Sequence, residues 1–368
     1  MIVNAGYRGK VGAAAPKFTY TGQYNIRKDG VVELLTSGTI VFLEPKVIDV
    51  FMVGGGASGM TPSGSQSQSH QGYGGGGGGY TRTVKHMPVL PNNSYTVTIG
   101  AGGVAASDVW NNPGGASAFN NYTVPGAPRQ TVYTAVGATG GSGGGGGVAS
   151  NSDYGAGGSD GNNGETGYPT RYSGGTGQGF TTREFGEAAG KLYAGAGGGG
   201  RYMSAQSPVI SAGGSGGGGS GSWASPDYKY QAAAAGVANT GGGGGGGVFG
   251  VNNSHRYPGG SGGSGIVCFR DAAALPELAG TWVLNERLYK SANIITENIN
   301  YTIGNTTCNG FHINKDYVMT RVTGQSGYSY IYKFATNEWA ISERSITITS
   351  TTASDEFRAW LASNATKQ

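Results

Sequence analysis

The chain has 368 residues, and 75 of them are glycine, far above the glycine share of about 7% in average proteins. Charged residues make up only 12%, and 24 Lys and Arg against 20 Asp and Glu give a formal net charge of +4. The charges form no block of one sign, no apolar run is long enough to cross a bilayer, and glycine lacks the three-residue period of collagen. We therefore expect no nucleic-acid partner, no membrane insertion and no collagen helix.

Short strand-like segments alternate with glycine-rich stretches after an N-terminal arm, residues 1–16, that has no periodicity. The expected strands are 18–20, 31–35, 39–43, 47–53, 80–86, 95–99, 117–124, 131–136 and 265–270. If consecutive strands run antiparallel, the glycine-rich stretches fall at one end of the sheet and the proline-rich turns fall at the other. The pattern predicts an all-β domain over residues 17–271, an antiparallel β-sandwich with a glycine-rich crown.

The glycine runs, of which 74–79 and 241–247 are the longest, allow two interpretations. Such runs are usually flexible linkers, but here the segments between them carry aromatic and charged residues. The ordered alternative is the polyproline-II conformation, which has three residues per turn and no internal hydrogen bonds, so that neighbouring glycine strands can approach and bond to one another. We expect a lattice of packed polyglycine-II helices in which Gly76, Gly145 and Gly244 leave no room for a methyl group.

The composition changes near residue 272, where an alanine- and proline-containing segment, 272–277, is expected to be a linker. Ordinary alternation returns in residues 278–368, which predicts a small β-rich domain that ends in a short helix beginning near Ser354. This domain is expected at the end of the sheet opposite the glycine crown, where it would serve attachment or assembly. The two cysteines, Cys268 and Cys308, have no metal-ligand spacing, and a disulfide framework is not expected.

No catalytic, cofactor-binding or metal-binding pattern emerges from the sequence. The four histidines are scattered, and none forms a metal-binding pair or neighbours a nucleophilic serine: His70, His86, His255 and His312. Asp153, Asp160 and Glu165 lie close together, but on glycine-rich loops they are expected to aid solubility rather than to hydrolyse sugars. We expect no enzymatic activity, no cofactor and no metal ion.

Aromatic residues between the glycine runs are the candidate contact surface. If the chain passes along the glycine crown six times after residue 136, alternately outward and inward, the segments 148–154, 180–194 and 222–240 lie at the far tip. The segments 60–73 and 104–112 are expected to join them there. Segments 159–173, 201–212 and 248–258 are expected near the sheet. Rigid aromatic side chains beside charges are frequent binding hot spots, which favours this set: Trp223, Tyr228 and Tyr230 first, Trp110 and Tyr193 second, with Phe185 and Arg183 beside them. The alternative is that these rings only cover the flanks of the lattice.

Four strand–glycine junctions carry a resemblance to a known family. They are the segment 50–56 (Val-Phe-Met-Val-Gly-Gly-Gly), the glycine run that ends in Tyr80, the segment 95–103 and the segment 262–267. Over roughly residues 17–271 the chain resembles the glycine-rich domain of phage tail and tail-fibre proteins. It is more distantly similar to the tip adhesins of T-even-type tail fibres, in which polyglycine-II helices carry receptor-binding loops.

This resemblance implies a virion protein of a phage or prophage, placed at a tail fibre or tail tip. Such a protein is made in the host cytoplasm, is released on lysis, assembles with other tail proteins and binds a host cell-surface receptor, either a carbohydrate or an outer-surface protein. Fibre proteins are often trimers, so a homotrimer is a possible assembly. Two alternatives remain open, a structural decoration protein of the capsid or tail without specific adhesion and, third, a surface polysaccharide hydrolase.

Overall fold

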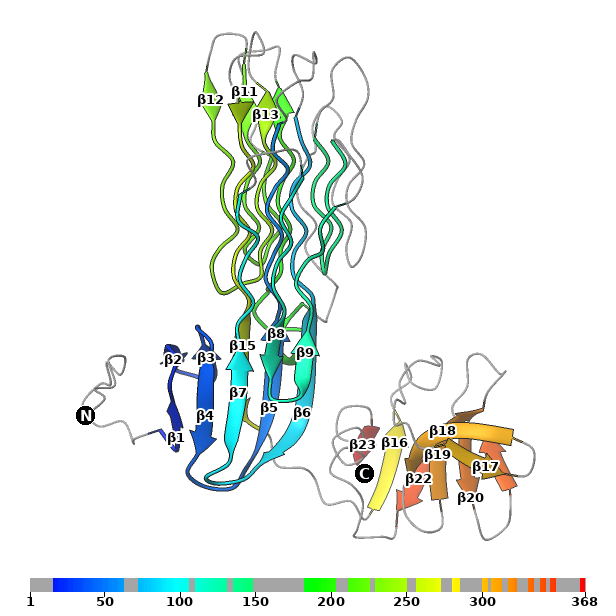
Figure 1. Ribbon diagram of the computed structural model, residues 1–368. Coiled ribbons are helices and arrows are strands. Elements are labelled where there is room, and N and C mark those ends of the chain that lie inside the picture. Colours follow the sequence, from blue (N-terminus) through cyan, green and yellow to red (C-terminus); the bar gives the residue numbers. More distant parts are fainter. Residues whose placement is uncertain are drawn as a thin grey trace, which may run out of the picture. The chain divides into compact units, whose positions relative to one another are not determined.

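The computed structural model describes residues 16–62, 72–105, 110–130, 135–147, 182–202, 211–225, 229–249 and 256–272, and the strands of a second unit beyond them (Figure 1). The chain divides into two compact units, Met1–Asp271 and Ala272–Gln368. Among the described residues, no helix is long and apolar enough to span a bilayer.

Two five-stranded antiparallel sheets form the sandwich of the first unit, which confirms the predicted all-β fold. One sheet has the order β1 (Phe18–Tyr20), β4 (Gly38–Phe42), β7 (Ser94–Thr98), β8 (Ser117–Phe119) and β9 (Tyr122–Val124). The other has the order β2 (Tyr24–Ile26), β3 (Val32–Leu34), β15 (Ile266–Asp271), β5 (Lys46–Val53) and β6 (Thr81–Val89).

Alternation along the strands fills the space between the two sheets with apolar side chains. The centre of this core is aromatic, because the Phe269 ring meets the rings of Phe18 and Phe42 edge-on at 5.4 and 5.6 Å. The strand expected at 131–136 is not part of either sheet in the described region. Ala135 instead accepts a hydrogen bond from Gly147 within the glycine-rich region.

Glycine-rich segments leave one end of the sandwich and run side by side as a bundle (Figure 1). Their hydrogen bonds change partner with a period of three residues, as the segment 72–80 shows. Its first set of amides bonds to one outward run, with Tyr73, Gly76 and Gly79 donating to Gly247, Gly244 and Gly241 at 2.8–2.9 Å. Its second set bonds to another run, with Gly75 and Gly78 donating to Gly145 and Ser142 at 2.9 and 3.0 Å.

A third neighbour of the same segment is bonded through carbonyl groups, since Gly74, Gly77 and Tyr80 accept from Met60, Ala57 and Gly54. A three-residue period of partners is the geometry of polyglycine-II helices, which have three residues per turn. The interior of the bundle is therefore mainly hydrogen-bonded backbone, with a few small side chains.

The spacing of the runs leaves no room for a side chain at the glycine positions inside the bundle. A Cβ atom on Gly76 would lie 2.6 Å from the Ser58 carbonyl oxygen, and one on Gly244 would lie 2.7 Å from the Ser261 oxygen. Gly145 is buried and bonded through both its amide and its carbonyl group. Side chains return on the outermost run, where Val237 is 56% exposed.

The direction of each run corrects the expected order of crossings. Residues 193–200 lead away from the sandwich. Gly197 and Gly200 bond to Gly76 and Tyr73, which makes the two runs antiparallel, and the run that contains Tyr73 and Gly76 continues into β6 of the sandwich. The chain then turns back near the sandwich twice, at 215–217 and at 238–241. The Asn239 amide group marks the second turn, since it donates to the Leu35 and Gly265 carbonyl oxygens at 2.8 and 3.1 Å.

Two segments expected near the sheet, 201–212 and 248–258, consequently have their described residues at the far end of the bundle. The segment 180–194, expected at the tip, has its described part beside the sandwich. The segment 222–240 spans both ends, and the described parts of 60–73 reach the far end. Residues 148–154 and 159–173 lie outside the described residues.

The described strands of the second unit form two antiparallel sheets. One has the order β22 (Ser345–Ile348), β16 (Gly280–Leu284) and β23 (Ala365–Lys367). The other has the order β17 (Asn300–Ile303), β18 (Thr306–His312), β19 (Tyr317–Val322), β20 (Tyr330–Lys333) and β21 (Glu338–Ile341). The helix expected near Ser354 lies outside the described residues, and the last described element is the strand β23.

Candidate functional site

Short strands gather at the end of the bundle that lies farthest from the sandwich, here called the distal end (Figure 1). A three-stranded sheet joins β10 (Arg201–Tyr202), β11 (Trp223–Ala224) and β12 (Tyr230–Gln231), and a hairpin joins β13 (Val248–Phe249) and β14 (Arg256–Tyr257). A small apolar core of Met60, Tyr73 and Phe249 lies beneath them. The bundle thus ends in large side chains, whereas its interior consists of backbone and small side chains such as those of Ala57 and Ser142.

Two predicted contact residues, Trp223 and Tyr230, lie at this distal end. The Trp223 indole N–H donates to the Gln231 Oε1 atom at 3.1 Å, which fixes the orientation of the half-buried ring. Tyr230 is 56% exposed and stacks on Tyr257 with ring centres 4.2 Å apart and planes 19° apart. The distal end therefore presents a pre-formed aromatic surface.

The other predicted contact residues are placed differently. Trp110 lies on a shorter glycine-rich segment that ends partway along the bundle, where the nearby Asn112 bonds to Ser58. The Arg129 guanidinium lies 5.9 Å from the centre of the Trp110 indole ring. Tyr228 lies outside the described residues. Phe185, Arg183 and Tyr193 belong to a loop beside the sandwich, so their assignment to the tip is wrong.

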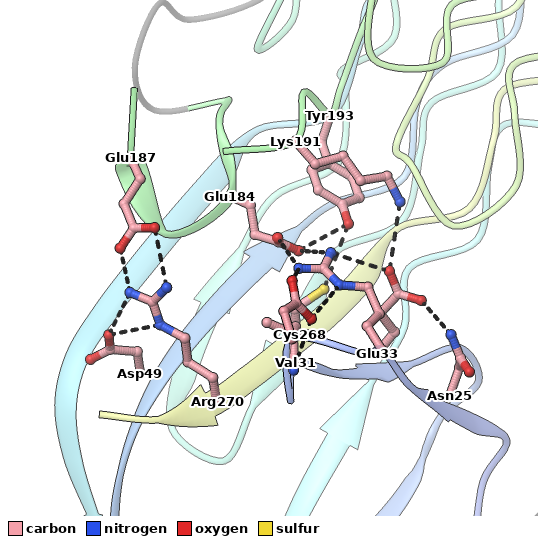
Figure 2. A network of polar contacts seen from close by, with 12 residues as sticks. Asn25, Val31, Glu33, Asp49, Glu184, Glu187, Lys191, Tyr193, Cys268 and Arg270 are labelled. Carbon is pink, nitrogen blue, oxygen red and sulfur yellow. Dashed lines mark hydrogen bonds and ion pairs between the residues drawn. The ribbon is translucent and has the colours of Figure 1, made fainter. Parts of the chain in front are cut away.

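This loop, residues 182–193, covers the outer face of the sheet that contains β5 and β15 (Figure 2). Tyr193 is fully buried and Phe185 is 3% exposed, both in a second apolar core with Phe51 and Cys268. Arg183 is half-buried and donates to the Gly190 carbonyl oxygen at 3.2 Å. Buried rings fixed against a sheet cannot contact a receptor.

Ion pairs hold the loop against the sheet, and we call the following set the clamp: Arg27, Glu33, Asp49, Lys85, Glu184, Glu187, Lys191, Tyr193 and Arg270. Arg27 binds both oxygens of the buried Glu184 carboxylate, at 2.9 and 2.6 Å, and the Tyr193 hydroxyl donates to Glu184 Oε1 at 3.1 Å. This arrangement satisfies the buried charge and leaves Glu184 an anchoring role rather than a catalytic one.

A second group of the clamp surrounds Arg270, which donates to Asp49 at 3.2 Å and to Glu187 at 3.1 Å (Figure 2). The Arg270 guanidinium also lies 4.2 Å from the centre of the Phe185 ring. Phe185 itself has a left-handed backbone (φ 53°), which is unfavourable for a bulky residue and which the surrounding contacts must hold in place.

The titration of the clamp follows from these contacts. Hydrogen bonds from Arg270 lower the pKa of Glu187, and hydrogen bonds from Arg27 lower the pKa of Asp29, an exposed residue between β2 and β3 that lies outside the clamp. Burial raises the pKa of the Tyr193 hydroxyl and of the Cys268 thiol, so both groups stay protonated at neutral pH. At neutral pH the clamp therefore holds an ionised Glu187 carboxylate against the Arg270 guanidinium.

Acid should loosen the clamp. Because the folded-state pKa of Glu187 lies below its unfolded value of about 4.3, its ionised form stabilises the fold above that pH, and the contribution is lost as the pH falls through the lowered pKa. We expect the Tm to stay level from about pH 7 to 5 and to fall below about pH 4. Circular dichroism melts should show a smaller acid-induced fall for E187Q, with E44Q as the control for loss of a carboxylate outside the clamp. Identical pH profiles for E187Q and the wild type would contradict this.

Sequence reasoning missed the partners that complete both sites. Tyr257 and Arg256 lie in the segment 248–258, for which the sequence predicts a place near the sheet, although the Arg-Tyr pair beside Pro258 is a usable signal of an aromatic loop. Glu184 bonds to Arg27 across 157 positions of sequence, a pairing that no local pattern shows. Among the described residues, no group of three or more His, Cys, Asp or Glu side chains is placed to hold a metal ion.

Comparison with known proteins agrees with the strand–glycine architecture. No curated protein matches the chain. The sequence model of a family described as "Glycine-rich domain" matches residues 36–271, a span that runs from just before β4 to the end of β15 and includes the whole bundle. Since that span is more than half of the chain, the protein belongs to this glycine-rich domain family.

Proposed function

We propose that this chain is a virion protein of a phage or prophage, placed at a tail fibre or tail tip, that binds the host cell surface through the distal end of its bundle. The observation that carries the proposal is the pre-formed aromatic surface of Trp223, Tyr230 and Tyr257 at the end of a bundle held together by backbone hydrogen bonds. A rigid scaffold that presents aromatic residues at its far end is how binding sites are usually built.

The two ends of the first unit support a division of labour. Asp271, where the first unit ends, pairs with Ile48 at the end of β15 away from the bundle, whereas Ile266 pairs with Val53 at the bundle end. Under this proposal the second unit serves attachment to other virion tail proteins, and the bundle projects toward a carbohydrate or an outer-surface protein of the host. The protein would be made in the host cytoplasm and released with virions on lysis, and a homotrimer is one assembly to test.

The purified protein should compete with virions for adsorption to host cells. The double variant W223A/Y230A should lose at least about 90% of this competition, because it removes the half-buried Trp223 ring and the exposed Tyr230 ring, while the Tm shifts by no more than a few degrees. The matched control is L90A, since Leu90 is also 56% exposed but lies at the β6–β7 turn, away from the bundle.

Two results would contradict the proposal. Full competition by W223A/Y230A would show that the distal end is not the contact surface. Normal adsorption of virions that lack the protein would favour a decoration role instead. Antibody labelling of intact virions should locate the chain at the tail.

A further inference from the structure

One flank of the bundle ends in the run of residues 232–238, which follows β12 and borders the bundle (Figure 1). A polyglycine-II helix has three residues per turn, so successive amides point in three directions. The Gly236 and Val237 amides donate to carbonyl oxygens of two different neighbouring runs, at 2.8 Å each. The amide of the exposed residue Ala235 points in the third direction and has no hydrogen-bond partner among the described residues. This run is therefore an open edge of the lattice, comparable to the edge strand of a sheet.

Within the lattice, a side chain and a neighbouring run exclude each other. A Cβ atom on Gly236 would overlap the Gly242 carbonyl oxygen, and one on Gly102 would overlap that of Gly262. Each of these glycines thus allows another run to lie against it at backbone distance. A residue that carries a Cβ atom at an equivalent position instead keeps a further run away from that side.

Side chains occupy the exposed positions of the run 232–238. Its sequence is Ala-Ala-Ala-Ala-Gly-Val-Ala, and its one glycine is Gly236, whose missing Cβ atom would point inward to Gly242. Val237 is the largest residue of the run and is 56% exposed. The exposed residues of the run all carry a Cβ atom, and they are Ala232, Ala234, Ala235, Val237 and Ala238. The places that a further run would need beside this edge are consequently filled by methyl groups.

A second run on the same flank shows the same arrangement in a different sequence. Residues 101–104 are bonded to the run 261–264 by a backbone hydrogen bond of 2.8 Å. Their two glycines face neighbouring runs, because a Cβ atom on either would overlap a backbone oxygen. Ala101 and Val104, one turn apart and therefore on the same side of the helix, are both exposed, and Val104 is 71% exposed. Glycine thus stands where another run lies against the residue, and Ala or Val stands where none does among the described residues.

Two serines complete the flank between these runs. The run 261–264 is bonded to both of them, and its residues Ser261 and Ser264 also lie one turn apart. Their Oγ atoms accept hydrogen bonds from the amides of Ala105 and Asn239, at 2.9 Å each. The serine side chains thereby occupy one amide of each neighbouring segment.

From this arrangement we infer that the exposed side chains of this flank prevent the lattice of a second copy of the chain from bonding to this one. Glycine runs of a second copy are the partner that such an open edge fits, because glycine runs already bond to one another in the antiparallel sense within the bundle. Natural sheets protect their edges against the same kind of association. The guard, as we call these residues, acts in this way whether or not the distal end binds a host cell, and it consists of Ala101, Val104, Ala232, Ala234, Ala235, Val237 and Ala238.

Sedimentation velocity of the full-length protein over a concentration series tests the guard. The variant A234G/A235G/V237G/A238G removes the Cβ atoms along one run, whereas the matched variant A234S/A235S/V237S/A238S keeps a Cβ atom at each position. We expect the glycine variant to self-associate at a concentration at least about tenfold lower than the wild type or the serine variant. If the fourfold glycine variant does not fold, the pair A235G/V237G and A235S/V237S provides the same comparison with a smaller change.

Hydrogen exchange distinguishes a joined lattice from a loosened fold, because added glycine also weakens a structure through the entropy of the unfolded chain. In the associated glycine variant, the amides of residues 234–238 should exchange at least about tenfold more slowly than in the wild type, since the open edge becomes hydrogen-bonded. Faster exchange of these amides would show that association follows local unfolding and would contradict the guard.

Three sedimentation results would also overturn the inference. A glycine variant that sediments like the wild type at every concentration would show that the edge needs no protection. Equal association of the glycine and serine variants would attribute the effect to the lost apolar surface rather than to the missing Cβ atoms. Wild-type oligomers that dissociate in the serine variant would make the flank a contact surface between copies, which is the opposite of a guard.

Discussion

Replacing Gly244 with valine should prevent the first unit from folding. Gly244 donates to Ala57 and accepts from Gly76, so its run is bonded to two others at this one residue. A Cβ atom there would overlap the Gly260 carbonyl oxygen and lie 2.7 Å from the Ser261 oxygen, far inside the usual contact distance of about 3.5 Å. The neighbouring runs would have to move apart and break their hydrogen bonds.

The cost should scale with the size of the side chain. Overpacking a close-packed interior typically costs about 1–3 kcal/mol, and rigid backbone on several sides places G244A at or above the upper end of that range. G244V adds two further methyl groups and should approach the total stability of a domain, about 5–15 kcal/mol. We expect G244A to lower the Tm clearly and G244V to yield insoluble protein.

The matched control adds the same two methyl groups on the outside of the bundle. Ala235 lies on the outermost run and is exposed, so A235V should leave the yield and Tm close to those of the wild type. Soluble G244V protein with an unchanged Tm would show that the runs behave as linkers rather than as a lattice. An equal fall in yield and Tm for A235V and G244V would show that the interior position of Gly244 is not the cause of the effect.

Local signals in the sequence were enough to predict the sandwich and its glycine-rich crown. The strand that ends at Val53 passes directly into Gly54, and the one that begins at Ile266 directly follows Gly265, so the chain itself shows which strand ends face the bundle. The alternation of apolar and polar residues over 95–99 is also a local signal, and it predicted the strand that the structure shows as β7.

The path of the chain through the bundle could not be predicted in the same way. A run of glycines has no side chains that record its direction, and a reversal within the lattice needs only three or four residues. One such turn, at 215–217, lies inside a glycine-rich stretch and was counted as part of a single crossing. Its only local mark is the left-handed backbone of Gly216 and Gly217, which glycine adopts without strain. The second turn near the sandwich, at 238–241, lies within the segment 222–240, and missing it placed the segment 248–258 at the wrong end of the bundle.

The loop 182–193 was misplaced for a different reason. Rings beside charges are typical both of an exposed binding loop and of a buried, ion-paired anchor. The difference lies in distant partners, here Arg27 and Arg270, which only the folded chain brings to Glu184 and Glu187. Charge content within a glycine-rich region is therefore a poor guide to exposure until its counter-charges are located.

Removing Arg27 should release this loop and cost the first unit about 3–5 kcal/mol, the usual effect of breaking a buried ion pair. The Arg27 side chain is 21% exposed and that of Glu184 is 5% exposed, so solvent screens the pair only weakly. Without Arg27, the Glu184 carboxylate would keep the Tyr193 hydroxyl, at 3.1 Å, as its hydrogen-bond donor. We expect R27A to lower the Tm by roughly ten degrees or more and to expose residues 182–193 to protease.

A double-mutant cycle separates the lost pair from a merely damaged hairpin. Neutralising the stranded carboxylate in R27A/E184Q should recover part of the stability that R27A loses, because the buried charge is then gone. K28A removes an exposed cation from the adjacent position and should leave both the Tm and the protease pattern unchanged. Additive effects of R27A and E184Q, or an R27A protein as stable as the wild type, would show that the loop is held by its apolar contacts with Phe51 and Cys268 alone. In either case the clamp would lose its role as the ionic link between the sheet and the loop 182–193.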